Sequence, residues 1–326
     1  MKQPLLWGLL STARINRVII PMLRISSRNT LDAVASRDVE KARRYAESWG
    51  IPRVVESYEA LLTDPEIDVI YIPLPNSLHA EWAIKALQAG KHVLCEKPIT
   101  ITVAEADALI RTAQETGKVL AEAFMYRHHP QTLKAKEIVE SGALGKLRLI
   151  RGCFSFNLNR DPDVRLNADL SGGSIWDVGC YPISYARFLA GCEPLEVFGW
   201  QTIGPTGVDV AFTGQMRFPG DLYAQFDSGF RVPYRAALEV VGSEATLRIE
   251  RPFKPGLAET LTIQRGDEIE SIPVMGQELY LGEVEDMADA ILLGKAPRIP
   301  LSDSRSNVAA LTALLQSARE SRPILL

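Results

Sequence analysis

The sequence predicts two domains, a doubly wound α/β domain on a parallel sheet followed by a domain on an open antiparallel sheet. Over residues 1–122, short apolar runs alternate with amphipathic stretches, as buried parallel strands joined by crossover helices require. Over residues 123–326, strands in which every second residue is apolar replace this alternation. A chain of 326 residues is long enough to hold both domains.

The elements of the first domain follow from its apolar runs and their spacing. We predict strands at residues 5–10, 30–35, 68–73, 92–96 and 119–123. Helices are predicted at residues 38–50, 76–90 and 102–117, where apolar residues recur at i, i+3, i+4 and i+7. The last of these opens with T-V-A-E, a capping box. Ligands of such sheets bind beyond the carboxyl ends of the strands.

The second domain is predicted to be a sheet with one covered face. Strands are expected at residues 208–218 and 222–226, and two hairpins at residues 238–250 and 261–272. Helices are expected at residues 131–141, 181–190, 283–293 and 303–319. The helix at 181–190 could cover one sheet face, which makes the other a candidate dimer surface.

Composition and charge exclude several classes of function. The net charge of −4 and the pI near 5.7 offer nothing that attracts nucleic acid or an acidic membrane. No apolar run approaches the roughly 20 residues of a membrane span. The first apolar run is interrupted at Gly8 and Ser11, so we interpret it as a strand rather than a signal peptide. Four cysteines without metal-ligand spacing are expected to be reduced, as in the cytoplasm.

The first strand-to-helix turn, G-L-L-S-T-A, is an imperfect dinucleotide fingerprint. Gly8 and Ala13 occupy the outer positions, but Leu10 stands where a second glycine would let the backbone approach a pyrophosphate. Either the loop is shifted, or Ser11 and Thr12 donate from their hydroxyls. A helix beginning at Ala13 would still present free N–H groups to an anion. A plain strand-to-helix turn is the alternative interpretation.

The end of the second strand favours NADP over NAD as the cofactor. Ser36 and Arg37 stand where NAD enzymes usually place an acidic residue for the ribose hydroxyls. A guanidinium and a hydroxyl attract a 2′-phosphate, and Lys41 could add a second positive charge. Asp38 opposes this interpretation, but it occupies the position of a helix N-cap.

Two further segments carry candidate catalytic groups. The run H-V-L-C-E-K-P places Lys97 at the carboxyl end of a strand, where it faces the ligand crevice or is simply a solvated loop lysine. In S-G-G-S-I-W-D-V-G-C-Y, Asp177 and Tyr181 are i, i+4 neighbours if the segment is helical. A nearby ammonium would make Tyr181 a better proton carrier. In the alternative, Tyr181 belongs to a core and Asp177 caps a helix.

Several stretches together resemble the Gfo/Idh/MocA family, the glucose-fructose oxidoreductase and inositol dehydrogenase group. They are GLLSTARI, AVASR, YIPLPNSLHAEWAIKALQAGKHVLCEKP, EAFMYRHHPQ and GGSIWDVGCYPIS. The STA turn and Tyr181, in place of histidine, resemble the branch of NADP-dependent xylose and glucose dehydrogenases, dihydrodiol dehydrogenases and ketosugar reductases. This resemblance implies a Rossmann domain over residues 1–122 and a mixed, largely antiparallel sheet domain over residues 123–326. It also implies homodimers, or dimers of dimers, formed through that sheet.

The resemblance also implies roles for individual residues. Lys97 would be the catalytic lysine, Tyr181 the proton donor or acceptor, and Asp177 a contact to substrate hydroxyls. Pro98 is expected to follow a cis peptide bond. The dinucleotide is expected at Gly8, Ser11, Thr12, Ala13, Arg14, Ser36, Arg37, Lys41, Pro73, Leu74, Pro75, Asn76, His79, Glu96 and Lys97.

Other polar residues are ambiguous. Arg127 follows a strand and has a role either in the site or in the structure. Arg165 either lines the sugar pocket or pairs with Asp169. His128 and His129 have no acidic or cysteine partner at ligand spacing, so we predict no metal site.

The expected function is hydride transfer between NADP, with NAD as the alternative, and a sugar or sugar-like polyol. An aldose dehydrogenase, a ketosugar reductase and a dihydrodiol-type dehydrogenase all fit the residues. A ligand sensor without catalysis is a more distant alternative, because a sensor has no need for both Lys97 and Tyr181.

Overall fold

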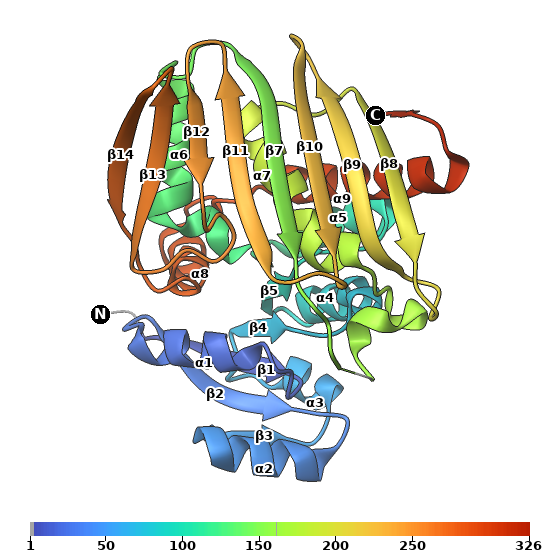
Figure 1. Ribbon diagram of the computed structural model, residues 1–326. Coiled ribbons are helices and arrows are strands. Elements are labelled where there is room, and N and C mark those ends of the chain that lie inside the picture. Colours follow the sequence, from blue (N-terminus) through green and yellow to red (C-terminus); the bar gives the residue numbers. More distant parts are fainter. Residues whose placement is uncertain (1–2, 161) are drawn as a thin grey trace. The chain divides into compact units, whose positions relative to one another are not determined.

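The computed structural model describes residues 3–160 and 162–326 and divides into two compact units (Figure 1). The first unit comprises the chain up to Met125 together with Tyr280–Arg305, and the second comprises Tyr126–Leu279 and Ser306–Leu326. This division differs from the single boundary that we expected between residues 122 and 123. The reason is helix α8 (Leu281–Leu293), because Val284, Met287 and Ala288 belong to the hydrophobic core of the first unit.

The first unit contains a six-stranded parallel sheet in the order β3-β2-β1-β4-β5-β6. Its strands are β1 (Leu5–Leu10), β2 (Asn29–Ala35), β3 (Arg53–Val55), β4 (Val69–Ile72), β5 (His92–Glu96) and β6 (Leu120–Ala123). The doubly wound domain is therefore confirmed. Two short elements were not predicted: β3, a strand of three partly buried residues, and the helix α3 (Tyr58–Thr63).

The helices that connect these strands in the first unit begin and end largely where the capping residues predict. They are α1 (Asn16–Ile25), α2 (Val39–Trp49), η1 (Asn76–Leu78), α4 (His79–Gln88) and α5 (Val103–Thr116). The capping box of Thr102 and Glu105 is present at the start of α5. The predicted start of α1 at Ala13 is wrong, because residues 14–15 form a turn and the helix begins at Asn16.

The second unit contains a nine-stranded mixed sheet in the order β14-β13-β12-β11-β7-β10-β9-β8-β15. Its strands are β7 (Leu147–Ser155), β8 (Glu196–Ile203), β9 (Asp209–Phe218), β10 (Leu222–Gly229), β11 (Arg235–Gly242), β12 (Thr246–Ile249), β13 (Ala258–Arg265), β14 (Glu268–Met275) and β15 (Ile324–Leu325). Strands β7 and β10 are parallel, and the other pairs are antiparallel. The predicted sheet class is confirmed, although β7, β8 and β15 were not foreseen.

Helices cover one face of this sheet and leave the other open. The helices α6 (Pro130–Glu140), α7 (Cys180–Ala190) and α9 (Leu301–Glu320) lie behind the sheet in Figure 1. In β9, Phe212, Met216 and Phe218 are buried toward these helices, while Thr213 and Gln215 are exposed on the opposite face. The period-two pattern of the sequence thus corresponds to a covered and an open face.

None of the helices in the described residues is long and apolar enough to span a membrane.

Candidate active site

The turn after β1, where we expected the dinucleotide phosphates, lacks the second glycine and has an unusual backbone conformation. Ser11 has a φ of 127°, and the Nδ2 of Asn16 donates to its carbonyl oxygen over 2.8 Å. The N-cap of α1 is Ile15, and the amides of Asn16, Arg17 and Val18 donate to the carbonyl oxygens of Ala13, Arg14 and Ile15. The expectation that the start of this helix presents free N–H groups to an anion is therefore wrong for these three amides. Packing also favours glycine at position 8, because a Cβ there would lie 2.9 Å from a methyl carbon of Leu61.

The end of β2 places a hydroxyl and a guanidinium where a ribose phosphate would be recognised. The hydroxyl of buried Ser36 accepts from the Asp38 amide over 3.3 Å. The Asp38 carboxylate accepts from the Lys41 amide over 2.9 Å, so it is the N-cap of α2, as predicted. Arg37 lies beside Tyr58. Burial raises the pKa of the Tyr58 hydroxyl, and the positive charge of Arg37 opposes that rise. With Asp38 engaged in the helix cap, this end of β2 fits a 2′-phosphate.

The loop after β5 is held by two carboxyl groups. The Tyr71 hydroxyl donates to Oε1 of Glu96 over 2.6 Å, and the Ile99 amide donates to Oε1 of buried Glu122 over 2.9 Å. The peptide bond between Lys97 and Pro98 is cis, as the resemblance implied. Lys97 therefore follows directly on a strand end whose neighbours are fixed in place.

His79 joins the loops that follow β4 and β5. Its Nδ1 lies 2.8 Å from the carbonyl oxygen of Pro98, and its Nε2 lies 2.7 Å from that of Leu74. Both partners can only accept, whereas a neutral imidazole has a single N–H, so only the imidazolium satisfies both. Burial lowers the pKa of His79, and the two carbonyl groups oppose that effect. Since the side chain is buried, His79 positions these loops instead of reaching a ligand with its ring.

A buried carboxyl group that we did not predict lies close to Glu96. Glu283 on α8 is 1% exposed, and neither of its carboxyl oxygens has a hydrogen-bond partner within the described structure. Burial raises its pKa well above the usual value, and the charge of Glu96 adds to the rise. The signal was available in the sequence, because Glu283 shares the apolar helix face of Met287 and Ala290 at i+4 and i+7.

In the second unit, Tyr181 is set into an aromatic cluster. Its ring centroid lies 5.8 Å from that of Tyr126, 5.3 Å from that of Phe154 and 5.6 Å from that of Phe253. Such contacts fix the plane of the phenol ring. The three partners were not foreseen, because they come from separate elements along the chain.

Asp177 lies in a π-helix, η5 (Ile175–Gly179), that leads into α7. Its Oδ2 accepts from the Nε of Arg165 over 2.7 Å, and Arg165 also contacts Asp163 over 3.2 Å. The pairing of Arg165 with Asp169 that we considered is therefore wrong, because η3 (Val164–Leu166) directs the guanidinium toward Asp163 and Asp177. The Asp177 carboxylate raises the pKa of Arg165. Single π-helical turns are frequent at functional sites.

The other basic candidates have structural contacts. Arg127, in η2 (Met125–His128), donates to the Ser184 hydroxyl over 3.3 Å and lies 4.0 Å from the centroid of the Phe188 ring. The Nδ1 of His129 accepts from the Gln131 amide at the start of α6. Within residues 3–160 and 162–326, no group of three or more His, Cys, Asp or Glu side chains is placed to hold a metal ion.

Two family profiles match the chain in sequence order. The profile described as an oxidoreductase family with an NAD-binding Rossmann fold matches residues 7–124, and that of the GFO/IDH/MocA C-terminal domain matches residues 132–248. The first profile covers the turn after β1 and the loops after β2, β4 and β5. The second covers η5 and the start of α7.

Individual relatives are similar over most of the chain. The D-xylose 1-dehydrogenase (NADP⁺) 2 of Haloferax volcanii is 37% identical over 96% of this chain and 97% of its own. The dTDP-3,4-didehydro-2,6-dideoxy-α-D-glucose 3-reductase of Streptomyces violaceoruber is 37% identical over 84% of this chain and 81% of its own. A crystal structure of a 3-ketoreductase from Actinomadura kijaniata with NADP and TDP-benzene superposes with a TM-score of 0.92, at 31% identity, over 97% of this chain and 98% of that one. The chain belongs to the Gfo/Idh/MocA family of oxidoreductases.

Proposed function

We propose that the protein is an NADP-dependent oxidoreductase that interconverts a hydroxyl group of a sugar, or of a sugar-like polyol, with the corresponding carbonyl group. The observation that carries this proposal is the strand end at Glu96, where Lys97 follows a carboxylate that Tyr71 holds. Ser36 and Arg37 at the end of β2 support NADP over NAD. The xylose dehydrogenase relative supports the aldose class of substrate, and dehydrogenation is the favoured direction.

Bound nicotinamide would supply or accept the hydride, and the residues of the chain would manage the proton and the charge. In oxidation, the Tyr181 phenolate takes the proton from the reacting hydroxyl and becomes the phenol, and in reduction the phenol returns that proton. The Lys97 ammonium binds the same oxygen and stabilises the negative charge that develops on it. Asp177, aligned by Arg165, accepts hydrogen bonds from neighbouring hydroxyl groups of the substrate.

A turnover assay tests this function. The purified protein is mixed with NADP⁺ or NAD⁺ and a panel of pentoses and hexoses, and formation of the reduced cofactor is followed by absorbance. Oxidation of an aldose with NADP⁺ is the expected result. An absence of cofactor binding would overturn the proposal.

A second candidate is the reduction of a ketosugar with NADPH. It is favoured by the relatives in Streptomyces violaceoruber and Actinomadura kijaniata, whose names state that activity. Tight NADPH binding with no oxidation of any free aldose, together with turnover of a nucleotide-linked ketosugar, would decide for this reaction. NADPH binding without turnover of sugars, ketosugars or diols would indicate a sensor.

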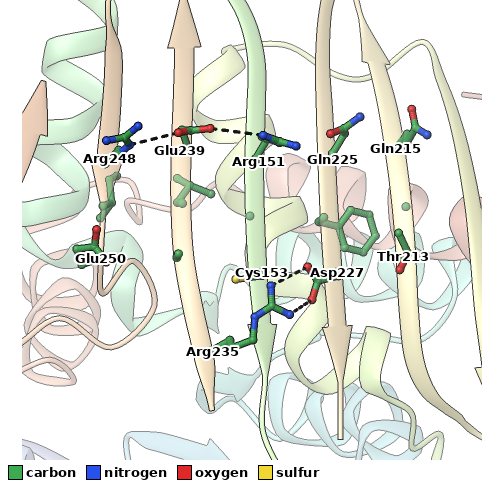
Figure 2. Close-up of a pocket in the computed structure, with 16 residues that line it drawn as sticks. Arg151, Cys153, Thr213, Gln215, Gln225, Asp227, Arg235, Glu239, Arg248 and Glu250 are labelled. Carbon is green, nitrogen blue, oxygen red and sulfur yellow. Dashed lines mark hydrogen bonds and ion pairs between the residues drawn. The ribbon is translucent and has the colours of Figure 1, made fainter. Parts of the chain in front are cut away.

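We also propose that the open face of the second sheet pairs with a second copy of the chain. Figure 2 shows residues that line a concavity on this face. The concavity has a volume of about 600 Å³, and its lining residues belong to β12, β11, β7, β10 and β9 and to Glu250 just after β12. Glu239 lies 3.9 Å from Arg151 and 3.3 Å from Arg248 on the same face. Alternating charges of this kind can complement the same surface on a partner related by a twofold axis.

The absence of disulfide bonds supports a reducing compartment, and we propose the cytoplasm. Within the described residues, Cys95, Cys153, Cys180 and Cys192 form no disulfide bond with one another. Localisation of the tagged full-length chain by cell fractionation would test this assignment.

A further inference from the structure

A buried carboxylate at the start of β9 holds the segment that carries Asp177. Asp209 is 4% exposed, and its Oδ2 accepts from the Ser174 hydroxyl over 2.5 Å and from the Ile175 amide over 2.9 Å. These donors stand immediately before and at the first residue of η5. Asp209 therefore satisfies a backbone N–H of the first helical turn, which has no partner within the helix.

The glycines before η5 let Asp209 and the preceding loop come this close. Gly173 has a φ of 126°, and a Cβ there would lie 2.3 Å from Oδ1 of Asp209. A Cβ on Gly172 would lie 2.4 Å from the carbonyl oxygen of Arg165. The Gly173 amide donates to that same carbonyl oxygen over 2.9 Å. The segment that begins η5 is thus fixed between the side chain of Asp209 and the backbone of the loop that carries Arg165.

The charge of Asp209 suits this position. A carboxylate at the N-terminus of a helical segment is stabilised by the partial positive charge of the free N–H groups. Burial raises the pKa of Asp209, and the hydrogen bonds from Ser174 and Ile175 oppose the rise. The only other polar side chain placed beside this contact in the described hydrogen bonds is Ser228, whose hydroxyl lies 3.4 Å from that of Ser174.

We propose that Asp209 is a positioning residue for the substrate, because it fixes the start of the π-helix and thereby the places of Asp177 and Tyr181. Asp177 lies two residues beyond the amide that Asp209 binds, and Tyr181 lies in the next turn. The proposal rests on the proposed function of those two residues. A displacement of about 1 Å in such groups can lower turnover by roughly a hundredfold. The residues proposed for the dinucleotide belong to the other unit, so cofactor affinity should not change.

The test compares two substitutions of the same residue. In Asp209→Ala, the Ser174 hydroxyl and the Ile175 amide lose their acceptor, and kcat/KM for the sugar should fall by about ten- to a hundredfold. In Asp209→Asn, the amide oxygen can still accept from both donors, so most of the activity should return. The dissociation constant of NADPH should stay within about twofold in both variants. Full activity of Asp209→Ala would overturn the proposal, and so would an equal loss in Asp209→Asn.

A matched control separates positioning from general loss of stability. Glu193 accepts two hydrogen bonds from Arg187, near the other end of α7, over 2.6 Å and 2.7 Å. Glu193→Gln weakens that pair and should lower the midpoint of thermal unfolding while leaving KM for the sugar unchanged. If Asp209→Ala does not fold, Ser174→Ala removes one of the two hydrogen bonds and should give a smaller loss of kcat/KM. An unchanged kcat/KM in Ser174→Ala would then count against the proposal.

Hydrogen exchange provides a readout that does not depend on turnover. Amides of residues 173–181 should exchange faster in Asp209→Ala than in the wild type, and at an intermediate rate in Asp209→Asn, which keeps the acceptor oxygen but loses the charge. Equal exchange in all three proteins would overturn the proposal. Failure of the wild type to oxidise or reduce any substrate would refute the proposed function instead, while the exchange data would still decide whether Asp209 holds η5.

Discussion

Tyr181 combines a buried ring with a role that requires its hydroxyl group. Replacement by phenylalanine keeps the three aromatic contacts and removes only the proposed proton carrier. We expect Tyr181→Phe to lower kcat by about 10²- to 10⁴-fold, the usual contribution of a general acid–base group, with NADPH affinity unchanged. Steady-state kinetics and a binding titration measure the two effects.

Tyr185 provides the control for that substitution. It lies one turn further along α7, is fully buried, and its ring stacks on Tyr126 at a centroid distance of 5.0 Å. Tyr185→Phe makes the same chemical change and should keep near wild-type turnover. If both variants are equally impaired, packing of α7 and not proton transfer explains the loss.

Arg37 is the residue that should set the choice between NADP and NAD. Loss of a charged hydrogen bond to a phosphate costs about 1.5–3 kcal/mol, which weakens binding roughly 10- to 150-fold. We expect Arg37→Ala to raise the dissociation constant of NADPH by that factor and to leave that of NADH unchanged. Isothermal titration with both cofactors measures this difference.

The control for Arg37 is a second exposed arginine close by. Arg44 lies on α2 and is exposed, so Arg44→Ala removes the same charge from this part of the surface. NADPH affinity should remain at the wild-type value in this variant. An equal weakening in the two variants would show that general electrostatic attraction is responsible, and not recognition of the 2′-phosphate.

At the scale of elements, α8 carries an acidic group into the core of the first unit, and this predicts a pH dependence of stability. Because the folded-state pKa of Glu283 is raised, the folded chain keeps a proton that the unfolded chain loses above pH 4.5. The free energy of unfolding should therefore fall as pH rises from 5 to 8, with a slope of at most about 1.4 kcal/mol per pH unit from this group.

Glu283→Gln removes the titration and keeps the shape. The variant should gain stability relative to the wild type as pH rises, as measured by denaturant unfolding at several pH values. Exposed Glu278, just before α8, offers the control, and Glu278→Gln should follow the wild-type pH profile. Parallel profiles for Glu283→Gln and the wild type would contradict the prediction.

Local patterns predicted most elements, because helix caps and apolar periodicity depend only on residues within a single segment. The cap at Asp38, the capping box at Thr102 and the strand that ends at Glu96 all belong to this class. Contacts between residues that are distant in the sequence produce no such local pattern. Asp209 and Ser174 are 35 positions apart, and only the pairing of β9 in the sheet brings the carboxylate to η5.

The same limit applies to the candidate site. Lys97, Tyr181 and Asp177 could be named from their motifs, but the partner of Arg165 could not. Asp163, Asp169 and Asp177 all lie within reach along the chain, and only the turn formed by η3 selects Asp163 and Asp177 over Asp169. Likewise, the sequence places His79 early in a helix but does not show that both of its nitrogens meet backbone carbonyls.

At the scale of the whole molecule, the open face of the second sheet predicts a dimer. Light scattering should give about twice the chain mass of 36.0 kDa. Glu239→Arg places a third positive charge between Arg151 and Arg248. The facing surfaces of two copies would then carry like charges and repel each other, which should favour the monomer. Sedimentation or light scattering over a range of concentrations measures the shift.

The control for the dimer prediction is a charge reversal elsewhere. Glu115 is an exposed residue on α5 of the first unit, and Glu115→Arg changes the net charge by the same amount. This variant should keep the mass of the wild type. A dimer that persists in Glu239→Arg would exclude this face as the interface.

Residues Tyr280–Arg305 belong to the first unit although they follow most of the second unit in the sequence, and this order matters during translation. While the ribosome translates residues 126–279, the sheet of the first unit is complete but α8 has not yet been synthesised. At roughly 5–20 residues per second, that interval lasts on the order of ten to thirty seconds. During this time the apolar surface that Val284, Met287 and Ala288 later cover is open to chaperones. A nascent chain truncated before residue 280 should accordingly stay bound to a chaperone, whereas one extended beyond residue 305 should be released.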